Sequence, residues 1–154
     1  PTSTGHFYFD FNVGGVNFLI LDCGEEKPDT DFEYSGIADY DRYRENEARW
    51  LEKKLADSAP CKMRIAALHI PPMTTSWHGD LHLRKTLMPV LNNAGVDLLL
   101  SGHTHKYMYL EPCEGMNFPN LVNDNNSVAL VEIADGKINI TISGKTNTSI
   151  TITK

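Results

Sequence analysis

The sequence has no run of eighteen or more apolar residues, about the length that an α-helix needs to cross a bilayer. Residues 1–11 lack the charged start and the apolar stretch that are typical of a signal peptide. Lys and Arg form no cluster, and 20 acidic against 14 basic residues give a formal net charge of -6. We therefore predict no membrane span and no nucleic-acid partner held through its phosphates.

Cysteine is also scarce. Cys23, Cys61 and Cys113 include no Cys-x-x-Cys pair, which argues against a cysteine-based zinc site and leaves their disulfide state open. The first residue is Pro1 and not methionine, which we interpret as a sign of a processed product or an excised fragment. If the chain is cut from a longer precursor, we expect a secreted or periplasmic location, and the sequence otherwise leaves the location open.

The apolar residues that are present follow two periodicities. Ala48, Leu51 and Leu55 recur at three- and four-residue steps, which predicts an amphipathic helix from about Asp41 to the stretch DSAP. A second helix is predicted over residues 81–95, where Pro89 either kinks it or begins another short helix. The predicted strands are residues 7–11, 13–22, 63–68 and 96–102, and then 107–112, 120–122, 127–134, 137–142 and 148–153.

The order of these elements is β-β-α-β-α-β, followed by a β meander. This order predicts an α/β (α+β) fold, in which a mixed β-sheet carries helices on one side and is followed by the C-terminal meander. The chain has 154 residues, of which 41% are hydrophobic, and it contains no repeat and no low-complexity linker. We therefore treat residues 1–154 as a single unit.

Histidines stand at the ends of two predicted buried strands. His69 follows residues 63–68, and His103 and His105 follow residues 96–102. In a right-handed β-α-β unit these strand ends lie on one edge of the sheet, where ligands bind. If the segment after the second strand is extended, its two histidines project to the same side. Because imidazole is the commonest metal ligand, we predict that His69, His103 and His105 form a metal site.

Three further residues lie between the two histidine motifs. Trp77, His78 and His82 share a loop and a helix start, from which they could overhang the crevice on the substrate side. The alternative, which we favour for both histidines and for His6, is an ordinary surface or core position.

The stretch AGVDLLLSGHTH (residues 94–105) closely resembles the last motif of the calcineurin-like metallophosphoesterases, which include the purple acid phosphatases. AALHIPP (residues 66–72) resembles the preceding motif of that family, a strand that ends in His-x-Pro. FYFDFNVGGVNFLILD and RWLEKKL resemble the segments before it, so the resemblance is strongest over residues 7–109.

The resemblance implies that residues 1–154 are a partial domain, the carboxyl-terminal half of a four-layer α/β/β/α sandwich. It implies a parent enzyme in which two metal ions (Zn, Fe or Mn) hydrolyse phosphate mono- or diesters by activating a bridging water. Carried over to this chain, His69 and His103 would bind one metal, and His105 would bind the other. No residue of the chain is assigned a catalytic role in that scheme.

Three earlier motifs of the family are missing from the chain: Asp-x-His, Gly-Asp with the bridging aspartate, and Gly-Asn-His. Asp80 and His82 have the first of these spacings but lie between the two late motifs. Three neutral histidines cannot offset the repulsion between two dications about 4 Å apart. Asp22 is a substitute carboxylate at another strand end, and without such a group we expect the isolated chain to be inactive.

Absence of the other half would leave the inner face of the sheet bare. We expect self-association through that face, pairing with the missing half, or a local rearrangement that covers it. Two other hypotheses stay open: one zinc ion held by the three histidines, giving weak hydrolytic chemistry, and a non-catalytic β-rich binding or assembly domain. The sequence names neither the substrate nor the metals.

Overall fold

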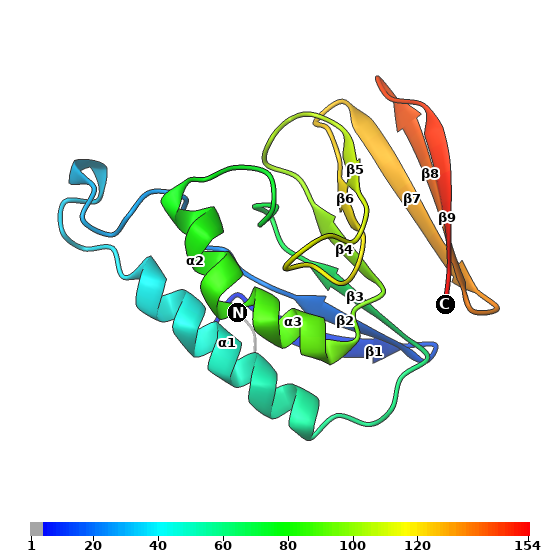
Figure 1. Cartoon of the computed structure of the whole chain (residues 1–154), viewed down its shortest axis with the longest axis horizontal. Helices are drawn as coiled ribbons and strands as arrows, with labels where there is room; N and C mark the ends of the chain where they lie inside the picture. Colours follow the sequence, from blue (N-terminus) through cyan, green and yellow to red (C-terminus); the bar gives the residue numbers. More distant parts are fainter. Residues whose placement is uncertain (1–4) are drawn as a thin grey trace.

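The computed structural model describes residues 5–154, which form three stacked layers (Figure 1). Helices lie on one face of a six-stranded sheet, here called the large sheet, and a three-stranded sheet, the small sheet, lies against the other face. The predicted fold class, a mixed sheet with helices on one side plus a β meander, is confirmed.

The large sheet combines parallel and antiparallel strands. Its strands, in spatial order, are β1 (Phe9–Val13), β2 (Val16–Ile20), β3 (Met63–Ala67), β4 (Leu98–Ser101), β6 (Asn120–Val122) and β5 (Met108–Leu110). The four central strands are parallel, and the two edge strands are antiparallel to their neighbours. The sequence pattern placed β5 and β6 in the meander, which is wrong. All three residues of β6 are buried, because the strand is paired on both sides within the large sheet.

The helices are α1 (Tyr40–Ala56), α2 (His78–Thr86) and α3 (Met88–Ala94), and a short 3-10 helix, η1 (Phe32–Tyr34), precedes α1. Pro89 stands in the first turn of α3, so it begins a second short helix and does not kink a long one. Leu51, Leu83 and Leu91 are fully buried against the large sheet. In residues 5–154 no helix has the length and apolar content that crossing a bilayer requires.

The small sheet consists of β7 (Ser127–Ala134), β8 (Lys137–Gly144) and β9 (Thr148–Thr153), which run antiparallel in sequence order. Every second residue of β8 is buried, and Ile138, Ile140 and Ile142 pack on the large sheet beside Ile65 and Leu98. The inner face that the sequence led us to expect bare is therefore covered at its centre by the chain's own last three strands.

The cover does not reach the edge strand β1. Phe9, Phe11 and Val13 stand on the same face as Val16 and Phe18, and their exposed fractions are 36%, 40% and 61%. Phe11 stacks on Phe18 with the ring centroids 4.9 Å apart. Residues 9, 11 and 13 thus form an uncovered apolar margin of the large sheet, which we call the β1 margin.

Two buried ionisable residues on α1 hold the loop that follows β2. Arg44 and Glu47 both have an exposed fraction of 0%. The Arg44 guanidinium donates to the carbonyl oxygens of Cys23 (2.7 Å) and Glu25 (2.9 Å), and the Glu47 carboxylate accepts the Asp22 N–H (2.7 Å). Because these backbone groups would otherwise lack partners, the contacts fix the path of residues 22–25.

Burial also changes the acidity of Glu47. It raises the pKa of this carboxyl from 4.5 to about 8, although the hydrogen bond from the Asp22 backbone opposes the shift. Its second oxygen, Oε2, has no hydrogen-bond partner among the described residues. The group is therefore largely protonated at neutral pH.

Replacing Ile140 with Ala should lower the free energy of unfolding by about 2–5 kcal/mol, because the change leaves a cavity between the two sheets. Urea denaturation measures this loss. Thr141→Ala, an exposed position on the opposite face of β8, is the matched control and should change stability by less than about 0.5 kcal/mol. Equal effects of the two variants would contradict the packing of the small sheet on the large one.

Glu47→Gln should flatten the pH dependence of stability between about pH 5 and 8. Because the pKa of Glu47 is raised in the folded chain, this residue contributes to the free energy of unfolding. The contribution is complete below pH 4.5 and is lost as the pH rises through about 8. The wild-type chain should therefore lose more stability than the variant over this range, by on the order of a few kcal/mol. Urea denaturation at several pH values measures the difference. Glu52→Gln, exposed on the same helix, should keep the wild-type profile.

Candidate functional site

The candidate site lies where the parallel strands β2, β3 and β4 end. An open groove of about 370 Å³, the histidine groove, runs across these ends. It is lined by Ile20, Leu21, Ala67, Leu68, His69, Leu100, Ser101 and Gly102. The carboxyl-end edge of a parallel sheet is where such folds bind ligands, so the groove has the expected location.

His69 and His103 lie side by side at this groove. Their ring centroids are 5.2 Å apart, and His69 Nε2 is 3.4 Å from His103 Nδ1. The Gly102 N–H donates to the carbonyl oxygen of His69 (3.0 Å), which ties the two strand ends together. The structure thus brings together two residues that are 34 positions apart in the sequence.

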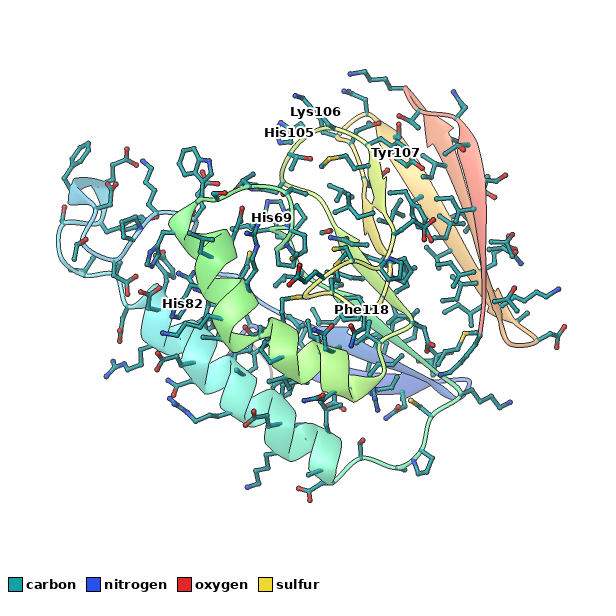
Figure 2. All side chains as sticks on the ribbon, in the orientation of Figure 1. His69, His82, His105, Lys106, Tyr107 and Phe118 are labelled. Carbon is teal, nitrogen blue, oxygen red and sulfur yellow. The ribbon has the colours of Figure 1, made fainter. Side chains whose placement is uncertain are left out.

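The backbone after β4 does not have the extended conformation that we expected. His103 and His105 both have left-handed backbones, with φ of 64° and 56°. The Thr104 N–H donates to the Gly102 carbonyl oxygen (2.7 Å), which closes a tight turn, so the i and i+2 side chains do not follow strand geometry. His105 is exposed beside Lys106 in the loop after β4, apart from His69 (Figure 2). In residues 5–154 no hydrogen bond or ring contact joins it to His69 or His103.

A carboxylate that the sequence did not single out lies beside the two histidines and forms a cluster with them. Glu26 Oε2 lies 2.8 Å from His103 Nε2, so the ring N–H donates to the carboxylate. Glu26 belongs to the loop after β2, whose carboxyl end lies on the same edge as those of β3 and β4. The acidic run DCGEE after a predicted strand was the available signal. Asp22, the substitute carboxylate considered from the sequence, instead accepts from the Tyr43 hydroxyl (3.0 Å) and the Gly24 N–H (3.1 Å).

The start of α2 holds Glu26 in place. The Gly79 N–H donates to the Glu26 carbonyl oxygen (2.8 Å), and a Cβ at position 79 would lie 2.8 Å from the Glu26 Cα. Only glycine permits this approach. Asp80, almost fully buried, accepts from the Thr75 hydroxyl. Burial raises the pKa of Asp80, while Arg84 and His103 partly oppose the shift and Glu26 adds to it, so the carboxyl lies within electrostatic reach of the cluster.

The residues predicted on the substrate side lie at the start of α2 and in its middle. His78 Nε2 is 2.8 Å from the Asp41 carboxylate, and His82 Nδ1 accepts from Arg44 Nε (3.2 Å). The two imidazoles stack with centroids 5.9 Å apart, and burial lowers the pKa of His82. These contacts tie α2 to α1. Trp77 has an exposed fraction of 51%, and a substrate-side role for the three stays a prediction.

The cluster does not amount to a complete metal centre. Within residues 5–154, no three His, Cys, Asp or Glu side chains lie close enough together to bind one ion. All three cysteines are free thiols, and burial raises the pKa of the Cys23 thiol to about 11. Two imidazoles beside one carboxylate suit part of a ligand set, but they supply no bridging group for a second ion.

Comparison with known proteins shows to which family the chain is similar. Residues 4–107 match the family model of the calcineurin-like phosphoesterases. Purple acid phosphatase 18 of Arabidopsis thaliana is 26% identical over 110 residues, which are 68% of this chain and 22% of the relative. Serine/threonine-protein phosphatase CPPED1 of Mus musculus is 31% identical over 111 residues, which are 66% of this chain and 33% of the relative.

A solved structure shows the same fold. The purple acid phosphatase PPD1 from seeds of yellow lupin (Lupinus luteus) superposes with a TM-score of 0.70 and 13% identity, over 99% of this chain and 34% of that chain. This chain spans only 22% and 33% of the length of the two curated relatives. Since the family model matches well over half of the chain, the protein belongs to the calcineurin-like phosphoesterase family.

Proposed function

We propose that this chain is the carboxyl-terminal half of a metal-dependent phosphoesterase that hydrolyses phosphate mono- or diesters with a metal-activated water. The supporting observation is the pairing of His69 and His103 at the ends of neighbouring parallel strands, in a chain of this family. Two imidazole nitrogens on one tetrahedral zinc ion, each bound at about 2.0–2.1 Å, lie about 3.4 Å apart. The 3.4 Å between His69 Nε2 and His103 Nδ1 matches that separation.

Glu26 acts in this proposal as the group that orients His103. Its carboxylate accepts a hydrogen bond from the Nε2–H of His103. The proton therefore stays on Nε2, and the lone pair of Nδ1 is directed to the side of His69. His69 and His103 would hold one ion and His105 a second, from among Zn, Fe and Mn. When bound, such ions polarise a phosphoryl oxygen and lower the pKa of a water.

The isolated chain is inactive in this proposal. The Glu26 carboxylate accepts from His103, the Asp22 carboxylate accepts from Tyr43, and His105 lies apart from His69 (Figure 2). A bridging carboxylate, an asparagine ligand and a leaving-group histidine would have to come from another polypeptide segment. The phosphate ester then binds only after both halves have assembled.

The β1 margin supports the same conclusion about the partner. Phe9, Phe11 and Val13 leave apolar area uncovered beside the small sheet, on the side where a second sheet would continue. The chain spans 22% to 33% of two curated relatives, so those relatives have the length to supply the remaining layer. We therefore propose the amino-terminal half of the phosphoesterase domain as the occupant, in preference to a second copy of this chain.

Turnover should appear only in the assembled pair. The isolated chain should not hydrolyse p-nitrophenyl phosphate, and adding an amino-terminal half that carries the three missing motifs should restore hydrolysis with two metal equivalents. His103→Ala should lower turnover at least about 100-fold and reduce the metal content, because a ligand is lost. Activity assays with elemental analysis measure both effects, and Lys106→Ala, exposed in the same loop, should change neither.

Three results would contradict this proposal. Turnover by the isolated chain with one metal equivalent would instead favour a mononuclear histidine site. Absence of metal at every pH, with stability unchanged by chelators, would favour a non-catalytic assembly domain. A folded pair that shows no turnover would count against the phosphoesterase itself.

Phe11→Asp should weaken pairing with the amino-terminal half at least about tenfold, because it places a charge in the apolar contact. Isothermal titration calorimetry measures the affinity. Phe32→Asp, with an exposed fraction of 85% and outside the margin, is the control and should bind as the wild type does. If the chain instead forms dimers that Phe11→Asp dissociates, the occupant is a second copy and the proposed partner is wrong.

A further inference from the structure

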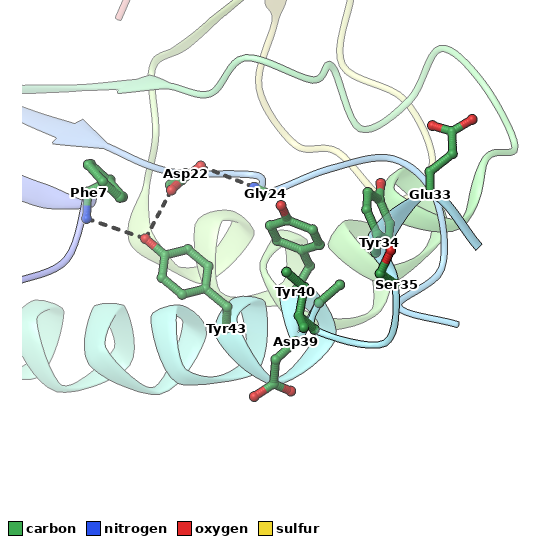
Figure 3. Close-up of a pocket in the computed structure, with 11 residues that line it drawn as sticks. Phe7, Asp22, Gly24, Glu33, Tyr34, Ser35, Asp39, Tyr40 and Tyr43 are labelled. Atoms are coloured by element: carbon green, nitrogen blue, oxygen red, sulfur yellow. Dashed lines mark hydrogen bonds between the residues drawn. The ribbon is translucent and has the colours of Figure 1, made fainter. Parts of the chain in front are cut away.

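A second hollow lies outside the histidine groove, between the loop that follows β2 and the start of α1 (Figure 3). We call it the tyrosine pocket. Its volume is about 470 Å³, within the range typical of small-molecule sites. It is lined by Phe7, Asp22, Gly24, Glu33, Tyr34, Ser35, Ile37, Ala38, Asp39, Tyr40 and Tyr43. None of His69, His103 and Glu26 lines it, and the phosphoesterase proposal gives it no role.

The walls of the tyrosine pocket are aromatic and closely packed. Tyr34 and Tyr40 meet edge to face, with centroids 5.5 Å apart and planes at 69°. Gly24 has a φ of 61°, and a Cβ there would lie 2.7 Å from the Tyr40 ring. The glycine therefore lets the loop pass directly over this ring. Tyr43 continues the wall and is fixed by its hydrogen bonds to Asp22 and to the Phe7 N–H.

The ionisable side chains of the lining, apart from the tyrosines, are all carboxylates: Asp22, Glu33 and Asp39. Two of them are already neutralised from outside the pocket, since Glu33 pairs with Lys27 and Asp39 pairs with Arg42. Asp22 differs, because it accepts two hydrogen bonds and, within residues 5–154, forms no ion pair. The pocket therefore places one carboxylate without an ion-pair partner beside the Tyr43 hydroxyl, in a lining that also contains the rings of Phe7, Tyr34 and Tyr40.

We propose that the tyrosine pocket binds a small organic cation with an apolar body, of the quaternary ammonium class. Aromatic faces attract such a cation through their quadrupoles, and the Asp22 carboxylate adds a direct charge attraction. An anion, including a phosphate ester, would meet three carboxylates and no cationic side chain in the lining, so it is a poor occupant. A metal ion is a poor occupant, because hard cations need several oxygen ligands in one shell and these walls are mostly carbon.

Choline and its neutral isostere 3,3-dimethylbutan-1-ol test the charge requirement on the full chain. Isothermal titration calorimetry should show choline binding about tenfold more tightly than the alcohol, and its NMR chemical-shift changes should map to Tyr40, Tyr43 and Gly24. Equal affinity of the two compounds, no choline binding at all, or shift changes confined to the histidine groove would overturn the proposal.

Two matched pairs of variants and one further control test the roles of Asp22 and Tyr40 in binding. Asp22→Asn should weaken choline binding about tenfold, whereas Asp135→Asn, exposed in the turn between β7 and β8, should not. Tyr40→Leu should weaken binding similarly, and Tyr40→Phe should keep it because the ring remains. Phe32→Leu removes an exposed ring of the same loop that does not line the pocket, and should bind as the wild type does. Loss of binding in both members of a pair, or in neither, would overturn the proposal.

Discussion

The buried side chains of Arg44 and Glu47 determine where the loop after β2 runs, and both sites described above depend on that path. A loop that leaves a parallel sheet carries backbone N–H and C=O groups that need partners when they are buried. Arg44 donates to two of the carbonyl oxygens and Glu47 accepts one N–H. With the backbone held in this way, the side chain of Asp22 faces the tyrosines of α1, while that of Glu26 reaches His103.

The same loop separates two kinds of chemistry. On one side, two imidazoles and a carboxylate gather at the strand ends, where folds of this kind bind ligands. On the other side, a carboxylate without a counter-cation faces aromatic rings, which suits an organic cation. The two sites differ in the side chains around the carboxylate, imidazoles in one and tyrosines in the other, although only three residues separate Asp22 from Glu26.

Much of the fold follows from periodicity, and the particular successes and failures have physical causes. The spacing of Ala48, Leu51 and Leu55 predicted α1 because one face of a helix must be apolar when it covers a sheet. The alternation along residues 137–142 predicted β8 within the C-terminal meander, and the antiparallel order β7-β8-β9 confirms it. Strand pairing depends on contacts between residues far apart in the sequence, and for that reason β5 and β6 were assigned to the wrong group.

By itself, the sequence determined the local elements, the family motifs and the meeting of His69 with His103, because right-handed β-α-β connections leave strand ends on one edge. Only the tertiary structure decided the role of Glu26, the left-handed turns at His103 and His105, and the cover that the small sheet gives the large one. These features arise from backbone groups and apolar faces that find partners across the fold. No local pattern of residues specifies which partner each will meet.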